Sequence, residues 1–396
     1  MDKKKEFKKG NLQEEGPKRV EKKNHRGRLL RLAGAVVGVL VIVLAAVLWD
    51  STAFDGLRRA VIYASAEKDE TGCAKLYTYA SEKDSCYASL GGSLVRATPR
   101  RILVLGEDGQ IRYNSDVKFH QSAIAVGSEV AAVYDIGGSD IYLVNDRGFV
   151  RQLTAEGEIL ACTVNEKNML AVTTGKSGYK AAVTVYGAEG EKLFGFHSSD
   201  RFLMTAALSR DGRQMAAVTL GQSEGVFSSG AVFYRLDSTE PLKDAQLTGS
   251  AVFDLVTMGK RWCAVAEDGL HFLSADGGEQ AYFNFGGEYL RRCSLEGDGF
   301  AAVLLGRYKA GTQTRLVSVD DEGQLLAQLD VDKEVLSLSA AGKYAAVLYS
   351  DELVIYDKKL EVCARLTDLS SAKQVLMRDD GSAVLVGADS ASLYLP

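Results

Sequence analysis

The stretch GSEVAAVYD, residues 127–135, returns along the chain in recognisable form. Close copies are RQMAAVTLG (213–221), DGFAAVLLG (298–306) and GKYAAVLYS (342–350). Weaker copies are GGSLVRATP (91–99), NMLAVTTGK (168–176), RWCAVAED (261–268) and DGSAVLVGA (380–388). The copies share one valine, found at Val95, Val133, Val172, Val218, Val265, Val303, Val347 and Val384. These valines are 37 to 47 residues apart, with a mean near 41, and self-similarity at such a period indicates a repeat architecture.

Each copy lies between other short apolar runs. It is followed by two alternating runs joined by a turn, as in IYLVNDRGFVRQL (141–153) and LVIYDKKLEVCARL (353–366). It is preceded by a further run, such as SAIAV (122–126). Alternation with Asp, Asn or Gly between the runs is typical of a β-hairpin. Each period therefore predicts four strands, which we name A, B, C and D, with the shared valine on B.

Four strands in about 40 residues are typical of one blade of a β-propeller, and a ring of blades covers the apolar faces that a single blade exposes. The eighth copy stops at SLYLP (392–396), after a strand C. The segment AKLYTYAS (74–81) alternates and precedes the first copy, so we expect it to complete the last blade. We predict an all-β propeller over residues 74–396 with eight four-stranded blades. Seven blades is the alternative if one weak copy forms only a ribbon.

The layout resembles the WD40 and quinoprotein types of propeller in its rhythm, although no copy ends in Trp-Asp. As a whole the chain also resembles an uncharacterised family of membrane-anchored repeat proteins from clostridial Gram-positive bacteria. Members of that family begin, as this chain does, with a basic tail and one apolar segment. The resemblance implies a propeller held at a membrane, and it implies no catalytic activity.

The apolar segment is LAGAVVGVLVIVLAAVLW, residues 32–49, which contains no charge. Its eighteen residues would span ~27 Å as a helix, close to the hydrocarbon thickness of a bilayer. We predict a transmembrane helix. A cleaved signal peptide is the alternative, but its apolar region is usually shorter, at about 7–15 residues.

Charge gives the orientation of that helix. Residues 1–31 hold twelve Lys and Arg against five Asp and Glu and are predicted to form a disordered cytoplasmic tail. Residues 17–31 carry seven of these cations, whereas residues 50–65 carry only Arg58 and Arg59. Because positive flanks stay in the cytoplasm, we expect a single-pass protein of the cell membrane with an extracytoplasmic C-terminal domain. Residues 50–73 would form a juxtamembrane helix or a linker.

The sequence offers little support for a reaction centre or a bound cofactor. It has no C-x-x-C pair, and its histidines, His25, His120, His197 and His271, lack ligand spacing. GQSEG (221–225) matches a nucleophile-elbow pattern, but no helix is expected after it. The tail has one aromatic residue, Phe7, which argues against nucleic acid. We therefore expect no cofactor, no metal and no nucleic-acid partner, and six cysteines that remain free thiols.

Loop length is the remaining functional signal. In a propeller the B–C and D–A loops share one face, and the B–C loops are long in the third (173–181), fourth (221–230) and sixth (306–314) repeats. Tyrosine and arginine in such loops are favoured at binding hot spots, although loop length also drifts without function. The candidate ligand-binding residues are Tyr179, Lys180, Phe227, Arg307, Tyr308 and Lys309.

Two classes of function fit these observations. The first is an extracytoplasmic binding or scaffolding module that recognises a protein or a glycan of the cell envelope. The second is an enzyme with its site in the central channel of the ring, as in lyases and quinoproteins with this fold. The second class requires converging acids, bases or a cofactor, and no such set stands out in the sequence. The first class is therefore favoured.

The predicted topology can be tested in cells. The chain should stay in the membrane fraction after a carbonate wash, because its apolar segment spans the bilayer. In protoplasts, external protease should digest the C-terminal domain and leave a short N-terminal fragment. A domain that becomes accessible only after lysis would contradict the orientation.

Overall fold

The computed structural model describes residues 67–223, 226–369 and 371–396, and single residues at positions 38, 39, 43, 55, 56, 59, 61 and 63. The chain divides into two units, residues 1–55 and residues 56–396. The predicted tail (1–31), nearly all of the predicted membrane helix (32–49) and half of segment 50–73 lie outside the described residues. Within the part that is described, no helix is both long and apolar enough to cross a membrane.

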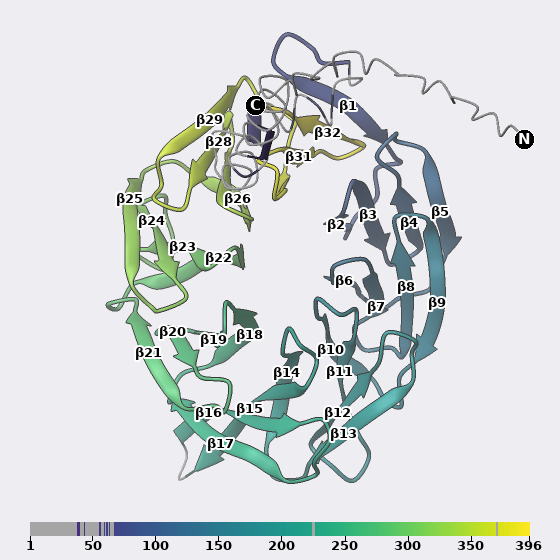
Figure 1. Cartoon of the computed structure of the whole chain (residues 1–396), viewed down its shortest axis with the longest axis vertical. Coiled ribbons are helices and arrows are strands. Elements are labelled where there is room, and N and C mark those ends of the chain that lie inside the picture. Colours follow the sequence, from purple (N-terminus) through teal and green to yellow (C-terminus); the bar gives the residue numbers. More distant parts are fainter. Residues whose placement is uncertain are drawn as a thin grey trace, which may run out of the picture. The chain divides into compact units, whose positions relative to one another are not determined.

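The described strands form eight antiparallel sheets of four strands each, and these sheets are the blades of a ring (Figure 1). Strands β2, β6, β10, β14, β18, β22 and β26 lie toward the centre of the ring, and β5, β9, β13, β17, β21, β25 and β29 follow its outer edge (Figure 1). The prediction of eight four-stranded blades is confirmed, and the seven-bladed alternative is wrong.

The first four blades are continuous in sequence. Blade 1 contains β2 (Cys86–Leu90), β3 (Ser93–Thr98), β4 (Arg101–Leu105) and β5 (Ile111–Asp116). Blade 2 contains β6 (Ser122–Val126), β7 (Ala131–Asp135), β8 (Asp140–Asn145) and β9 (Gly148–Thr154). Blade 3 contains β10 (Ile159–Val164), β11 (Leu170–Thr174), β12 (Ala181–Tyr186) and β13 (Lys192–Ser198). Blade 4 contains β14 (Phe202–Leu208), β15 (Gln214–Ser223), β16 (Val226–Arg235) and β17 (Pro241–Thr248).

The last four blades continue the pattern until the end of the chain. Blade 5 contains β18 (Val252–Met258), β19 (Arg261–Ala266), β20 (Gly269–Leu273) and β21 (Glu279–Asn284). Blade 6 contains β22 (Tyr289–Gly297), β23 (Phe300–Gly306), β24 (Thr314–Asp320) and β25 (Leu325–Val331). Blade 7 contains β26 (Val335–Ala341), β27 (Tyr344–Tyr349), β28 (Glu352–Asp357) and β29 (Val362–Thr367). Blade 8 contains β30 (Gln374–Met377), β31 (Ala383–Val386), β32 (Ser390–Tyr394) and, from the other end of the domain, β1 (Cys73–Thr78).

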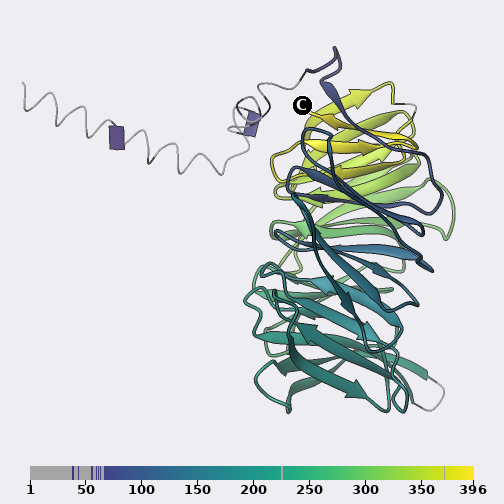
Figure 2. The same cartoon turned by 90° about the vertical axis from the view of Figure 1, so that its right-hand side faces the viewer.

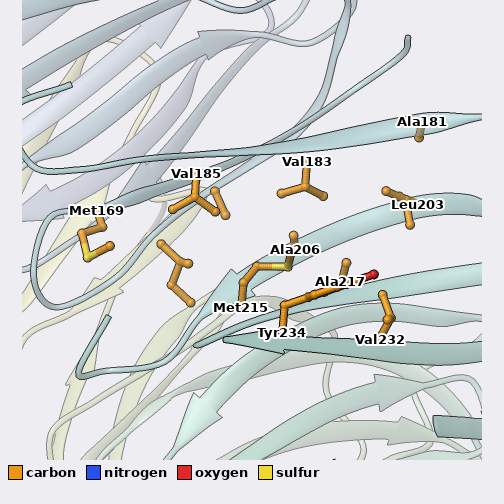
Figure 3. Close-up of a cluster of buried hydrophobic side chains, with 12 residues drawn as sticks. Met169, Ala181, Val183, Val185, Leu203, Ala206, Met215, Ala217, Val232 and Tyr234 are labelled. Atoms are coloured by element: carbon orange, nitrogen blue, oxygen red, sulfur yellow. The ribbon is translucent and has the colours of Figure 1, made fainter. Parts of the chain in front are cut away.

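The repeated phrase forms the B strands, which are the most buried part of each blade. All eight marker valines lie on B strands and have no exposed surface. Pairs of fully buried alanines precede four of them, as at Ala131 and Ala132 in blade 2. Blades approach one another toward the centre of a ring, so small residues are needed on the inner strands and larger ones farther out. Figure 3 shows this packing between blades 3 and 4, where Ala206 and Ala217 lie among Val183, Met215 and Tyr234.

Because neighbouring strands are antiparallel, the loops of every blade alternate between two faces. The B–C and D–A loops lie on one face, which we call the upper face, and the A–B and C–D loops lie on the other, the lower face. Figure 2 shows the ring from its side, with the strands running across its thickness. Each A strand therefore begins at the upper face and ends at the lower face.

The ring is closed by β1, which pairs with β32 in antiparallel register from Cys73↔Tyr394 to Thr78↔Ser390. The first strand of the domain thus supplies the D strand of the last blade, and Figure 1 shows the two strands side by side. Tyr77 on β1 is fully buried, and its hydroxyl donates to the carbonyl of Gly92 in blade 1 at 2.9 Å. One strand therefore links blade 8 to blade 1.

Two buried arginines strengthen this closure. Arg378, at the end of β30, donates to the carbonyl of Gly92 at 3.0 Å and to the hydroxyl of Tyr77 at 3.3 Å. Arg96 on β3 is 1% exposed, and its guanidinium lies 4.8 Å from the ring centre of Tyr79, directly after β1. The hydroxyl of Tyr79 donates to the carbonyl of Ser390 on β32 at 2.9 Å and so holds the ring within blade 8. The contact of Arg96 with this ring therefore joins blade 1 to blade 8.

Side-chain hydroxyls connect neighbouring A strands elsewhere in the ring. The amides of Val375 and Met377 on β30 donate to Ser337 and Ser339 on β26, at 3.2 and 3.0 Å. The amide of Ala340 donates to Ser294 on β22 at 2.8 Å. An A strand has a neighbouring strand on one side only, so these serines satisfy backbone groups on its open edge.

Ring closure should be sensitive to Tyr77. Tyr77→Ala removes a buried ring and the hydroxyl that joins two blades, so we expect the free energy of unfolding to fall by about 3–5 kcal/mol. Thr78→Ala, an exposed position on the same strand, should change it by less than about 1 kcal/mol. Denaturant titration of the full-length protein, followed by tryptophan fluorescence, measures both. Equal losses in the two variants would contradict a closing role for Tyr77.

Candidate functional site

Two of the predicted ligand residues lie where blades 3 and 4 meet on the upper face. Tyr179 and Lys180 are exposed in the B–C loop of blade 3. The ring of Tyr179 is 4.9 Å from that of His197 on β13, and the ammonium of Lys180 is 4.9 Å from the ring centre of Phe202. Because Phe202 begins β14, Lys180 connects the loop to the inner strand of the next blade.

Phe227 lies on a strand, and its assignment to a loop was wrong. The pairing of β15 with β16 continues to Ser223↔Val226, and Phe227 is opposite Gln222. The Gly and Ser residues here suggested a loop, but the backbone groups remain paired, so the hairpin extends beyond the blade. The ring of Phe227 is 58% exposed near the tip of this hairpin. Ser223 of the elbow-like GQSEG sequence lies in the same strand pair.

The other three predicted residues lie in the B–C loop of blade 6. Tyr308 is 57% exposed, and the guanidinium of Arg307 is 6.0 Å from its ring centre. The ammonium of Lys309 is 5.7 Å from the ring centre of Tyr289, the first residue of β22. The predicted residues thus form two groups, one at blades 3 and 4 and one at blade 6, with blade 5 between them.

A series of β-bulges occupies the inner strands between and beside these groups. The pairing of A with B shifts near the upper end of β10, β14, β18, β22 and β26, in five consecutive blades. In blades 1, 2 and 8 the same pairing is regular. A bulge leaves a residue without an opposite partner and changes the direction of its side chain, and bulges are frequent beside functional sites. The residues within the five shifts include Leu160, Met204, Phe253, Arg291 and Leu336, which we call the bulge arc.

The first half of the bulge arc exposes large apolar side chains. Leu160 is 44% exposed, Met204 is 43% exposed and Phe253 is 53% exposed, on three neighbouring blades. Phe202 and Tyr289, at the starts of β14 and β22, are 53% and 38% exposed. All five lie on A strands toward the upper face. They form an apolar rim on the inner side of blades 3 to 6.

The second half of the bulge arc borders a polar cavity of about 440 Å³. It lies along the inner strands of blades 6, 7 and 8, beside the bulged residues Arg291 and Leu336. The other residues around it include two cations, Arg292 and Lys373, and two neutral polar residues, Ser337 and Gln374. The upper inner rim therefore changes from apolar to cationic around the ring.

Acidic groups lie farther along the A strands of blades 5 and 6. The surrounding protein restricts hydration of Asp254 on β18, and this raises the pKa of its carboxyl. Solvent reaches Glu296 on β22, yet the surrounding protein again raises its pKa, and repulsion from Asp254 and Asp379 raises it further. Among the residues that the structure describes, no group of three His, Cys, Asp or Glu is placed to hold a metal ion.

Sequence reasoning missed the A-strand residues of this site. The search considered loops, because binding residues concentrate there, whereas Met204, Phe253 and Arg291 lie on strands. One signal was available: AIAVG in blade 2 alternates small and branched residues, whereas FLMTA in blade 4 and YLRRC in blade 6 carry large or charged residues in succession. Such a run cannot be buried on one side of an inner strand, and it therefore indicates exposed side chains.

The fold defines a WD40-like β-propeller, and its upper inner rim exposes apolar side chains. The chain belongs to the family of unknown function DUF5711, whose model matches residues 67–386. This match covers nearly the whole ring, including the closing strand β1. No curated protein matches the chain.

Solved structures agree on the fold. The C-terminal WD40 domain of Sif2 matches with a TM-score of 0.59 and 13% identity, covering 81% of this chain and 97% of that chain. A structure described as the eukaryotic initiation factor matches with a TM-score of 0.52 and 10% identity, covering 83% and 87%. The hydrazine synthase of Kuenenia stuttgartiensis reaches a TM-score of 0.44 at 12% identity, covering 83% and 96%. At these identities the likeness concerns the fold alone.

The inner acids should make stability depend on pH. A carboxyl whose pKa is raised in the folded state binds protons more tightly there than in the unfolded chain, so stability falls as pH rises from the ordinary glutamate pKa through the folded value. Glu296→Gln removes the carboxyl group, so the variant does not show this fall in stability as pH rises. We expect the variant to melt at a higher temperature than the wild type at pH 7.5, with a smaller difference at pH 4.5. A constant difference at both pH values would contradict the raised pKa of Glu296.

Proposed function

We propose that this protein is a membrane-anchored, extracytoplasmic binding module whose upper inner rim holds an apolar segment of a partner protein. The observation that carries the proposal is the exposure of Leu160, Met204 and Phe253 on the inner strands of three successive blades. Burial of apolar surface contributes about 25 cal/mol per Å², so a partner that covers these side chains gains binding free energy from each. The five bulges present them on a rigid scaffold.

The outer edge of the ring provides an internal comparison. Exposed apolar side chains also occur on D strands, such as Ile111, Phe149, Leu193 and Val362. These residues belong to different blades and are separated around the circumference, and scattered single apolar residues are ordinary on a protein surface. The residues of the apolar rim instead lie on the inner strands of four neighbouring blades. On the outer edge the largest such group within the described ranges, Leu325, Leu326 and Leu329, belongs to the single strand β25.

The side chains of the rim favour a protein over a glycan. Sugars stack on aromatic rings but also require polar groups that hydrogen-bond to their hydroxyls. Leu160 and Met204 are aliphatic, and methionine adapts to partners of varied shape. Phe253, Tyr289 and Tyr308 add aromatic area of the kind enriched at the centres of protein interfaces. The similarity to WD40 domains agrees with this choice, although that similarity concerns the fold and does not identify a partner.

The described residues that precede the ring contact its lower face. Arg59 donates to the carbonyl of Asp380 at 2.8 Å, and the hydroxyl of Tyr63 donates to the carboxylate of the same residue at 2.8 Å. Asp380 lies in the A–B loop of blade 8, so the chain arrives at the lower face.

An enzyme with its site inside the ring is the second candidate. Asp254 and Glu296 favour it, because carboxyl groups with raised pKa values can transfer protons near neutral pH. A reaction site also needs a feature that binds substrate next to these acids. The exposed apolar residues lie toward the upper face, whereas Glu296 lies near the lower end of β22. A binding module therefore explains the exposed apolar residues of the rim better than an enzyme does.

Site-specific photocrosslinking in cells tests the binding module. A benzophenone amino acid is placed at Phe253 or at Tyr308 in the full-length protein, and at Phe149 on the outer edge as the control. Phe149 is 48% exposed, close to the 53% of Phe253. We expect the same protein adduct from both upper-face positions and none from the control. Met204→Asp should reduce the adduct at both positions, because a charge in the rim opposes apolar contact.

The proposal would be overturned by adducts that are equal at position 149, or by adducts with carbohydrate alone. It would also be overturned if Met204→Asp left the yield unchanged while its control, Leu193→Asp on the outer edge, reduced it. Circular dichroism of both variants establishes that the ring is folded. The external protease experiment described above tests the proposed location separately.

A further inference from the structure

We propose that the cavity beside β22, β26 and β30 is a carboxylate-binding site that receives acidic side chains of the partner segment. The inference deepens the proposed function and rests on it for the identity of the partner. Binding of carboxylates by the cavity itself can be measured without that partner. The ligand class is therefore an acidic peptide that also carries apolar residues.

Unpaired cations are the first argument. Arg291, Arg292 and Lys373 line the cavity, and Arg307 and Lys309 lie in the adjoining loop of blade 6. Across the described ranges, none of the five makes an ion pair. Glu288, directly before β22, is paired with Arg315 and so does not neutralise them. Glu296 lies on β22 itself, near its lower end, and makes no ion pair with them among the described residues. Five cations without carboxylate partners create a positive potential that attracts an anionic ligand.

A second cavity of the ring shows the opposite arrangement. It has a volume of about 690 Å³ and lies on the upper face of blade 7. There Lys333 is 2.6 Å from Glu352, and Arg365 pairs with the same carboxylate. Its cations are neutralised by the protein, whereas those beside β22 are not. This difference is the reason for assigning the ligand to the first cavity.

The composition of the chain makes the gathering of cations informative. The whole chain has a net charge of −5, and residues 1–31 contribute +7, which leaves −12 for the remainder. In an acidic domain, cations are expected to find carboxylate partners on the surface. Arg201, for example, donates to Asp244 at 2.8 Å. Single cations without an ion pair, such as Arg147 and Lys260, also occur elsewhere among the described residues, but here five of them gather beside one cavity.

The arginines are held in place by backbone carbonyls. Arg291, at the bulge of β22, donates from Nη2 to the carbonyl of Tyr308 at 2.8 Å. Arg292 donates from Nε to the carbonyl of Val335 on β26 at 3.3 Å. These bonds fix the guanidinium groups and leave further N–H donors for a ligand, and arginine commonly binds a carboxylate through two such donors. Lys373 reaches the same cavity from the loop before β30.

The neighbouring residues favour an acidic peptide over a phosphate polymer. Leu336 and Leu338 line the cavity together with the cations, and the apolar rim continues from it through Tyr289 to Phe253. A polyphosphate has no apolar groups to cover this rim. A peptide with carboxylates at one end and apolar side chains at the other can contact both the cationic cavity and the apolar rim.

The test uses the full-length protein in detergent and fluorescein-labelled hexaglutamate, with hexaglutamine as the neutral probe. Fluorescence anisotropy should show binding of hexaglutamate only, weakening as salt is raised. The double variant Arg292→Gln with Lys373→Gln should bind at least tenfold more weakly. The matched control is Arg147→Gln with Lys260→Gln, two exposed cations of the lower face, and it should bind as the wild type does. Arg292→Lys with Lys373→Arg should restore most of the binding.

Several results would overturn the assignment. One is equal binding of hexaglutamate to the cavity variant and to the lower-face control, which would indicate general attraction. Another is binding of tripolyphosphate without binding of hexaglutamate. The same variants in the crosslinking experiment separate this inference from the proposed function. If Met204→Asp abolishes the adduct and the cavity variant leaves it intact, the binding module stands and the carboxylate site does not.

Discussion

The pairing of β1 with β32 is the contact on which the rest of the ring depends. Each blade covers its two apolar faces only with two neighbours, so a ring that fails to close leaves two faces in water. Among the eight described sheets, blade 8 differs from the others because its outer strand, β1, comes from the opposite end of the domain. Tyr77, Tyr79, Arg96 and Arg378 concentrate their hydrogen bonds and ring contacts there. Closure is thus achieved by specific polar contacts in addition to apolar packing.

Closure fixes the positions of the B and C strands, and this leaves the inner strands free to vary. The B strands are buried almost completely in every blade, because they lie between neighbouring sheets with little space for large side chains. An A strand contributes less to this packing and has an open edge toward the centre. A bulge in it disturbs few buried contacts. The same architecture that buries the B strands and places a valine on each of them therefore allows five successive A strands to bulge.

This division also explains which features could be predicted. The B strands were found from the repeat because packing between blades requires the same small residues eight times, as in Ala216, Ala217 and Val218. The number of blades followed from that count and from the strand that completes the last blade. The bulges could not be found in this way, since they depend on backbone pairing in strands with no constant apolar pattern. Phe227 was placed in a loop because its neighbours are Gly and Ser, although backbone pairing extends the hairpin past them.

The contrast between repeated and unrepeated features is the strongest reason to place function on the upper inner rim. Folding of a propeller requires similar blades, and it gives no reason for one sector to differ from another. Blades 1 and 2 have regular A–B pairing and serve as comparisons within the same molecule. Against them, blades 3 to 5 expose Leu160, Met204 and Phe253, and blades 6 to 8 surround a cavity with Arg291 and Arg292. Such a change from apolar to cationic within one arc does not follow from folding. The proposed ligand, with an apolar part and an acidic part, would supply a physical reason for it.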